Sequence, residues 1–287
     1  MEMFAQLFGY YLLNNDIISR EQLNEALVNK NIYKSKLGSL FTDAGYMTKE
    51  QAEYIHTEQK HFDKKFGDIA VFLGFLTRAQ MEELVKRQEQ DDTALYDALI
   101  AKGYITSSEH KNLLQTFRQE LGLTDELSDK DLVRDLINIY ELEGNEYKDI
   151  YADYVALFVR NAIRFVGDDF AFSSFNPEKE AFQECMVSQK IEGKLSLDVE
   201  VYGAVETFEE FSRRYSENIG ANSVGIGDFL DLQNALYASN RFASDNLKVT
   251  LSSRISDTDR NITTEDKKVV IPLSFTFGKI YLCVIKK

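Results

Sequence analysis

The sequence predicts a multidomain protein, in which an all-α N-terminal helical repeat module precedes an α+β domain with an antiparallel sheet. Three observations predict it. The chain has 287 residues, more than one domain usually needs. Its first 120 residues repeat a helical pattern, and beyond residue 147 strand-like alternation mixes with amphipathic helices. We therefore expect repeats over 1–120, a helical connector over 121–147 and the α+β domain over 148–287.

The composition limits the classes of partner. The formal net charge is −14, and an acidic surface disfavours nucleic acid and anionic membranes, which both bind basic proteins. No run approaches the roughly 18 apolar residues of a membrane span. The first residues lack the basic stretch that opens a signal peptide. We expect a cytoplasmic protein with neither nucleic acid nor membrane as a partner.

The repeat region consists of four units with a constant spacing. "GYYLLNNDIISREQLNEAL", "GSLFTDAGYMTKEQAEYI", "GDIAVFLGFLTRAQMEELV" and "YDALIAKGYITSSEHKNLL" align with steps of 29 residues. Three columns keep this step: Gly9, Gly38, Gly67 and Tyr96; Asp16, Gly45, Gly74 and Gly103; Ser19, Thr48, Thr77 and Thr106. Because the columns never slip, the period predicts helical pairs that stack to bury their apolar faces.

Each unit reads as a short helix, a tight turn and a longer helix. The hydroxyl residue of the third column is followed three residues later by Gln or Glu. This spacing is typical of a capping box, which satisfies the free N–H groups at a helix start. The second column suits the left-handed residue that ends a helix, which is most often glycine.

The middle units carry a more specific pattern. "KLGSLFTDAGYMTKEQAEYIHTEQ" (36–59) and "KFGDIAVFLGFLTRAQMEELVKRQ" (65–88) resemble the tandem motif of the N-terminal domain of type II secretion ATPases and the MshE family. The resemblance implies a site for cyclic di-GMP at Lys36, Leu37, Gly38, Gly45, Gln59, Lys65, Phe66, Gly67, Gly74 and Gln88. Both leading arginines of the motif are lysines here, which lack the planar guanidinium. We therefore expect weak or no binding of cyclic di-GMP. The favoured interpretation is a structural repeat that binds protein or no ligand, the nucleotide site is the alternative, and we expect no other cofactor.

The C-terminal half predicts alternating helices and strands. After a connector helix that begins near Ser128 or Asp129, we expect helices over 147–167, 206–217 and 226–242. Strands are expected over 168–175, 247–253, 268–277 and 279–287, and a two-stranded hairpin over 182–205 turns near Glu192 and Gly193.

One predicted helix, "GDFLDLQNALYASN" (227–240), carries an unusual polar stripe. Asp228, Asp231 and Asn234 recur every three residues on an otherwise apolar segment, so they are expected on neighbouring turns. The simplest interpretation is the solvated face of a half-buried helix.

A second resemblance suggests a function for this polar stripe. Residues 148–287 resemble the CheX/CheC family of chemotaxis phosphatases through "RFVGDDFAF", "VSQKIEGKLSLDVEVYGAVETFEEFSRRYS" and "VVIPLSFTFGKIYLCVIKK". That family carries E-x-x-N on a helix, with a glycine four residues after the Asn. Here Asp228, Asp231 and Ala235 take the places of the Glu, the Asn and the Gly.

The resemblance implies a partner and a reaction. In the family, the helix docks on the phosphorylated receiver domain of a response regulator. The Glu pairs with a receiver lysine, and the Asn orients the water that attacks the aspartyl phosphate. Asp231 departs from this pattern because a carboxylate has no N–H and adds negative charge beside the phosphoryl group. Asn234 could form a shifted pair with Asp231, displaced by about 5 Å along the helix axis.

These observations favour a two-component or chemotaxis-type signalling protein. Its α+β domain is expected to dock on a receiver domain, with phosphatase activity weak or lost. Two alternatives stay open: an active aspartyl-phosphate phosphatase of a CheY-like regulator, and an adaptor that responds to cyclic di-GMP. A homodimer also stays open.

Overall fold

The computed structural model describes residues 4–33, 41–42, 44–59, 64–83, 94–120, 147–193, 196–222, 224–245, 249–263 and 268–287. The predicted connector helix near Ser128 lies outside the described residues. Within them, no helix is long and apolar enough to span a membrane.

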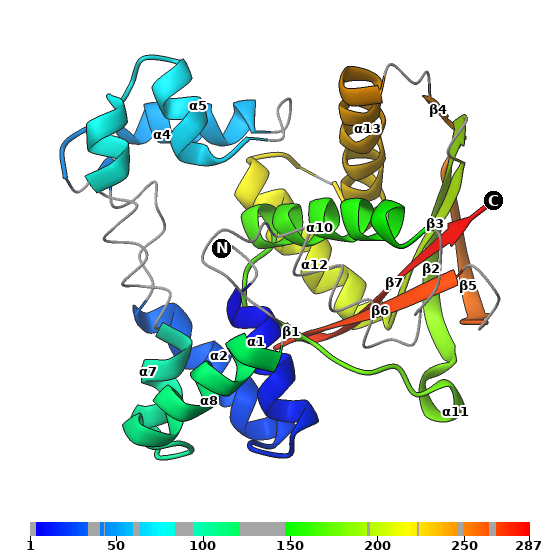
Figure 1. Ribbon diagram of the computed structural model, residues 1–287. Coiled ribbons are helices and arrows are strands. Elements are labelled where there is room, and N and C mark those ends of the chain that lie inside the picture. Colours follow the sequence, from blue (N-terminus) through cyan, green and yellow to red (C-terminus); the bar gives the residue numbers. More distant parts are fainter. Residues whose placement is uncertain are drawn as a thin grey trace. The chain divides into compact units, whose positions relative to one another are not determined.

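Helices dominate the N-terminal part of the chain, and strands enter after residue 169 (Figure 1). In order, the elements are α1 (Phe4–Asn14), α2 (Arg20–Tyr33), α4 (Lys49–Glu58), α5 (Phe66–Phe72), α7 (Ala94–Ala101), α8 (Ser107–Glu120), α10 (Lys148–Phe165), β1 (Phe170–Phe172), α11 (Pro177–Glu180), β2 (Phe182–Gly193), β3 (Leu197–Gly203), α12 (Val205–Ile219), α13 (Ile226–Asp245), β4 (Val249–Leu251), β5 (Ile255–Asn261), β6 (Lys268–Phe275) and β7 (Gly278–Lys286).

The chain forms two compact units. One combines Met1–Asn24 with Ser108–Lys287, and the other is Glu25–Ser107. Helix α1 belongs to the first unit because it packs on β1. Its Gln6 Nε2 donates to the carbonyl oxygen of Asp168 over 3.0 Å, and a methyl group at Gly9 would lie 3.3 Å from the Ala171 Cβ. The repeat region of 1–120 therefore spans both units, and whether it acts as one domain stays a prediction.

The four repeat turns share one backbone conformation. Asp16, Gly45, Gly74 and Gly103 have φ values of 53°, 73°, 75° and 72°. In each turn the next residue donates its N–H to the carbonyl five residues earlier, at 2.9 to 3.0 Å: Ile17 to Leu12, Tyr46 to Phe41, Phe75 to Ala70 and Tyr104 to Leu99. This is the helix-ending bond pattern that a left-handed residue permits. The predicted role of the second column is thereby confirmed, at Asp16 as well as at the glycines.

The predicted capping boxes are confirmed in the first three repeats. The hydroxyl oxygen of Ser19, Thr48 and Thr77 accepts from the backbone N–H three residues later, at 3.3 Å in each case. In return, the Gln side chains at 22, 51 and 80 accept from the backbone N–H of the capping residue at 2.8, 2.8 and 2.9 Å. Each box satisfies two N–H groups that the helix itself leaves free.

The two middle repeats share one apolar core. It contains the buried side chains of Phe41, Met47, Ala52, Ile55, Phe66, Ile69, Ala70 and Leu76. The rings of Phe41 and Phe66 stack at 6.0 Å. Residues from both sides of each turn enter this core, so the second and third repeats bury their apolar faces against one another.

The described strands form a seven-stranded antiparallel sheet in the order β1-β6-β7-β3-β2-β4, with β5 also paired to β2. The hairpin of β6 and β7 pairs Phe275 with Gly278, and that of β2 and β3 pairs Ile191 with Leu197. Together with the helices, this sheet makes the C-terminal half an α+β fold, as predicted.

Helices α10, α12 and α13 cover one side of the sheet (Figure 1). Alternate residues of β3 point toward them: Leu197, Val199 and Val201 are fully buried. The helices lock together through aromatic contacts. Phe229 of α13 meets Phe158 of α10 at 5.2 Å and Phe211 of α12 at 5.1 Å between ring centroids. Helix α13 is therefore held from three directions, by α10, α12 and β2.

A buried ion pair fixes α12 to the start of the sheet. Arg214 Nη1 donates to both carboxylate oxygens of Asp169, at 2.7 and 2.9 Å. Asp169 precedes β1 and also accepts from the hydroxyl of Thr276 in the turn between β6 and β7. The guanidinium lies 4.4 Å from the ring centre of Phe277. One carboxylate thus joins three segments that are far apart in the sequence.

The predicted elements of the C-terminal half are confirmed, with two omissions. In the predicted hairpin, β2 ends at Gly193 and β3 begins at Leu197. The structure adds α11, a single turn, and the strand β5, "ISDTDRN". Strand β5 escaped prediction because its side chains are mostly exposed and polar, so it lacks the apolar alternation that marks a half-buried strand.

The turn glycines give a stability prediction. A methyl group at Gly74 would meet no atom within 4 Å, yet φ is 75°, so Gly74→Ala should cost only the backbone strain, about 1 to 2 kcal/mol. The reverse change, Asp16→Gly, should stay within about 0.5 kcal/mol because glycine adopts this region freely. Urea unfolding of both variants measures the difference. Equal stabilities of Gly74→Ala and the native chain would contradict the assigned turn.

Candidate functional site

The first turn of α13 is capped by its own acidic residue. The Asp228 Oδ2 accepts from the N–H of Gly225 at 2.7 Å, and the Ser212 Oγ accepts from the N–H of Ile226 at 3.1 Å. These acceptors satisfy N–H groups that a helix start leaves free. Asp228 therefore has a fixed rotamer, although its side chain is 45% exposed.

Asp231 lies one turn further along the same face and shares a cation with Asp228. The Nη1 atom of Arg254 lies 3.3 Å from the Asp228 Oδ1 and 3.1 Å from the Asp231 Oδ2. Arg254 belongs to the segment between β4 and β5. The side chain of Asp231 is 44% exposed and that of Arg254 is 34% exposed. Two carboxylates and one guanidinium thus form a half-exposed charged cluster, which we call the α13 acid face.

A chain of hydrogen bonds leads from this face into the core. Asp231 Oδ1 accepts from Gln189 Nε2 at 3.0 Å. The Gln189 Oε1 in turn accepts from Asn234 Nδ2 at 2.7 Å, and the Asn234 Oδ1 accepts from the hydroxyl of Tyr154 at 2.5 Å. Gln189 Nε2 also donates to the carbonyl of Ser252, over 3.0 Å. The chain joins α10, α13 and β2, and it fixes the orientation of the Asp231 carboxylate.

The placement of Asn234 corrects the predicted polar stripe. Its side chain is fully buried, whereas Asp228 and Asp231 are half-exposed. The reason is the helical repeat: each residue turns by about 100°, so six residues leave Asn234 about 120° away from Asp228 around the axis. A stripe of three-residue steps therefore winds from the surface into the core. The shifted pair of Asp231 and Asn234 does not lie on one exposed face, and Asn234 serves the interior network.

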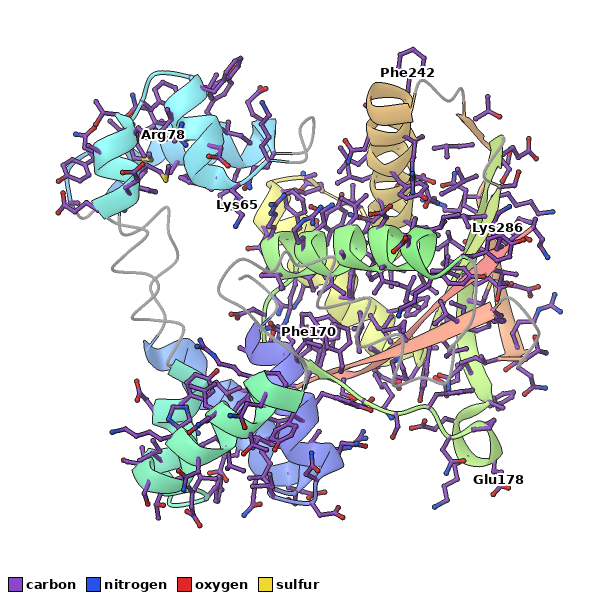
Figure 2. All side chains as sticks on the ribbon, viewed as in Figure 1. Lys65, Arg78, Phe170, Glu178, Phe242 and Lys286 are labelled. Atoms are coloured by element: carbon purple, nitrogen blue, oxygen red, sulfur yellow. The ribbon has the colours of Figure 1, made fainter. Side chains whose placement is uncertain are left out.

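Ala235, at the position of the family's glycine, is exposed on α13. The other end of this helix is marked by the exposed side chain of Phe242 (Figure 2). The acid face thus occupies only the first turns of α13, where Gly225 and Ser212 fix the helix start.

Burial and the neighbouring Arg254 act in opposite directions on the pKa of Asp231. Partial burial raises the pKa of its carboxyl, and the charge of Asp228 adds to this, whereas Arg254 and the bond from Gln189 oppose it. Burial also raises the pKa of Tyr215 to about 12, with help from Asp228 and Asp231. Burial is therefore the main cause of the raised pKa of Asp231, and Asp228 makes a smaller contribution.

Most of the described residues that the resemblance implies for cyclic di-GMP take part in turns, packing or hydrogen bonds of the fold. Gly45 and Gly74 are the left-handed turn residues, and a methyl group at Gly67 would come within 2.8 Å of the Met81 side chain. Phe66 belongs to the core. Gln59 is 2% exposed and donates to the carbonyl of Lys64 over 3.3 Å.

Lys65, which is exposed, precedes α5 (Figure 2). Lys36, Leu37, Gly38 and Gln88 lie outside the described residues. The nucleotide site stays the alternative hypothesis for the repeats.

Two residues that contact Asp231, Gln189 and Arg254, were not predicted from the sequence. The sequence pattern could have indicated Gln189, because it lies between the apolar Val187 and Ile191, which β2 buries at alternate positions. A polar residue in that series indicates a buried partner. No sequence pattern could have indicated Arg254, since its partners on α13 lie 23 and 26 residues away in the sequence. In the described parts of the chain, no group of three His, Cys, Asp or Glu side chains is placed to hold a metal ion.

Comparisons with known proteins find likenesses of structure alone. No protein-family model matches the chain, and no curated protein sequence matches it. CheX from Vibrio vulnificus is 9% identical, with 47% of this chain and 96% of CheX covered, at a TM-score of 0.36. CheX from Desulfovibrio desulfuricans is 8% identical, with 48% and 99% covered, at 0.37.

A complex of CheX with CheY, BeF3 and Mg²⁺ from Borrelia burgdorferi is similar at 7% identity, with 47% of this chain and 95% of the matched chain covered, at a TM-score of 0.36. About half of the chain is therefore similar to solved CheX structures. Because the TM-scores lie below 0.5, these likenesses carry no argument about function.

The buried amide gives a stability prediction. Asn234→Leu removes the acceptor of Tyr154 and the donor to Gln189, which leaves two buried polar groups unpaired. We expect a loss of about 2 to 4 kcal/mol in the free energy of unfolding. Asp231→Leu, on the half-exposed face of the same helix, should lose less than about 1 kcal/mol. Urea unfolding of the two variants tests this order, and a reversed order would contradict the network.

Asp231 also gives a prediction about pH. Its raised pKa means that the folded chain binds this proton more tightly than the unfolded chain does. The carboxyl therefore favours folding below its unfolded pKa, and this contribution declines as the pH rises through the raised pKa. Asp231→Asn removes the titration, so its stability relative to the native chain should increase between pH 4 and about pH 7.

Asp257 supplies the opposite control. Hydrogen bonding from Arg260 lowers the pKa of its carboxyl, so Asp257→Asn should lose stability relative to the native chain as the pH rises from about 2 to about 5, through the unfolded pKa. Thermal unfolding at several pH values measures both slopes. Slopes of the same sign would show that the assigned environment of Asp231 is wrong.

Proposed function

We propose that the C-terminal half docks on a response-regulator receiver domain through the α13 acid face. The observation that carries this proposal is the pair Asp228 and Asp231, one turn apart and half-exposed, with each carboxylate held by fixed donors. In the motif E-x-x-N these two positions supply the side chains that reach the receiver. A pre-oriented pair loses less conformational freedom on binding than free side chains do.

The chemistry of the pair favours binding over hydrolysis. An Asn at position 231 would offer an N–H to orient the attacking water. Asp231 can only accept hydrogen bonds while it is ionised, and one of its oxygens already accepts from Gln189. Its charge also opposes the approach of an anionic phosphoryl group. We therefore propose that hydrolysis of the receiver's aspartyl phosphate is weak or lost.

The alternative is an active phosphatase in which Asp231 accepts a proton from the attacking water. The raised pKa of its carboxyl makes it a better proton acceptor than an ordinary aspartate. This alternative predicts that hydrolysis depends on Asp231 itself.

For the repeats, we propose a helical module over 1–120 that binds protein. The common turns and capping boxes support a repeated architecture, and acidic helical repeats offer broad surfaces for protein partners. An adaptor role for cyclic di-GMP is the weaker hypothesis, because Gly45, Gln59, Phe66 and Gly74 already have structural roles.

The docking proposal predicts a separation of binding from catalysis. Receiver domains from the same genome are treated with beryllofluoride, which mimics the phosphorylated aspartate, and titrated with the full chain by calorimetry. We expect one of them to bind more tightly when activated. Release of phosphate from that receiver, once phosphorylated, should be slow with the native chain.

Restoring the motif should restore activity. Asp228→Glu with Asp231→Asn returns the longer acid and a neutral amide, and we expect hydrolysis to rise by at most about 10²- to 10³-fold, the usual value of one well-placed polar group. Asp257→Asn, the same change on β5, should leave the rate unchanged. Rapid hydrolysis by the native chain that disappears in Asp231→Ala would support the active-phosphatase alternative instead.

A further inference from the structure

Arg254 has donors that the fold does not use. Its Nη1 atom contacts both carboxylates of the acid face. Among the residues that the structure describes, no acceptor bonds to its Nε or Nη2. The side chain is 34% exposed, so part of it faces the solvent. A guanidinium anchored through one nitrogen, with others left over, is able to bind a further oxyanion.

The backbone of α13 is shaped to receive this side chain. A methyl group at Gly227 would lie 2.7 Å from Nη1, 2.8 Å from Cζ and 2.9 Å from Nε of Arg254. These distances are too short for a carbon atom, so a side chain at residue 227 would displace the guanidinium from its position against the main chain. Gly227 immediately precedes Asp228, and the arginine is therefore part of the acid face.

The charge of Arg254 reduces the electrostatic repulsion that a phosphoryl ligand would meet here. Asp228 and Asp231 alone would repel an anionic group. Arg254 places one positive charge between them, at 3.3 and 3.1 Å. Its planar array of N–H groups suits the oxygens of a phosphoryl group better than a lysine does. The acid pair then orients the guanidinium and limits its rotation.

We propose that Arg254 binds the phosphoryl group of the docked receiver and so makes docking depend on phosphorylation. The proposal rests on the proposed function and adds a residue to it. Asp228 and Asp231 are positioning residues for the guanidinium, while its Nε and Nη2 donate to the phosphoryl oxygens. Nothing in this role requires a covalent step.

A competing role follows from the same contacts. Ion pairs at 3.1 and 3.3 Å between partly exposed groups are weak, so a basic side chain of a partner could displace Arg254 from the two carboxylates. In that case the arginine would oppose docking. The two roles predict opposite effects of removing Arg254, and the free donors favour the binding role.

The first experiment needs no receiver. Acetonylphosphonate, the non-hydrolysable analogue of acetyl phosphate, is titrated into the full chain, and the arginine side-chain signals are followed by ¹⁵N NMR. We expect the Arg254 Nε signal to shift in a saturable way. Arg260 on β5 is the control, since its Nε is bound to Asp257 at 2.8 Å. Equal or unsaturable shifts at both arginines would overturn the proposal.

The second experiment uses a beryllofluoride-activated receiver that binds the native chain. Arg254→Gln should weaken binding of the activated receiver about 10- to 100-fold, as expected for losing a hydrogen bond to a charged group. Binding of the same receiver without beryllofluoride should change less than about twofold. Arg254→Lys should recover part of the loss, and Arg260→Gln, with the same change of charge, should have no effect.

The outcomes separate this inference from the docking proposal. Tighter binding of both receiver forms by Arg254→Gln would show that the arginine opposes docking. An equal loss for both forms would show a general contact rather than phosphoryl recognition. If no receiver binds the native chain, the docking proposal fails, and the analogue titration alone decides whether Arg254 binds an acyl phosphate.

Discussion

The hydrogen-bond chain from Asp231 to Tyr154 is the constraint on which the rest of the site depends. An ionised carboxylate only accepts, so the amide N–H of Gln189 must face Asp231. The Gln189 oxygen then faces the Asn234 amide, whose oxygen faces the Tyr154 hydroxyl. One surface charge thus sets the orientation of two buried amides, and those amides join α13 to α10 and β2.

The sequence could predict what local rules determine. The glycine column follows from the need for a left-handed residue, and the structure has it at Gly45, Gly74 and Gly103. The capping residues follow from the free N–H groups of helix starts. Strand β5 could not be predicted in this way, because it is held by pairing with β2 and not by an apolar face.

The site could likewise be predicted only where local rules determine it. Asp228 and Asp231 are one turn apart on one helix, so their proximity is a local property. Asn234 was misplaced because helical drift accumulates over six residues. Arg254 reaches the site through a tertiary contact that no spacing in the sequence indicates, and it changes the charge of the face from that of two bare acids to that of an acid pair around a cation.

The central claim is that the acid face of α13 contacts a receiver domain. It is tested most directly by a photo-crosslinking residue at the exposed Ala235, one turn beyond Asp231, in the full chain expressed in its native cells. Mass spectrometry identifies the captured proteins, with the same residue at the exposed Glu178 of α11 as control. We expect a receiver-domain protein at Ala235 alone. Capture of the same proteins at both positions, or of no receiver at Ala235, would contradict the account.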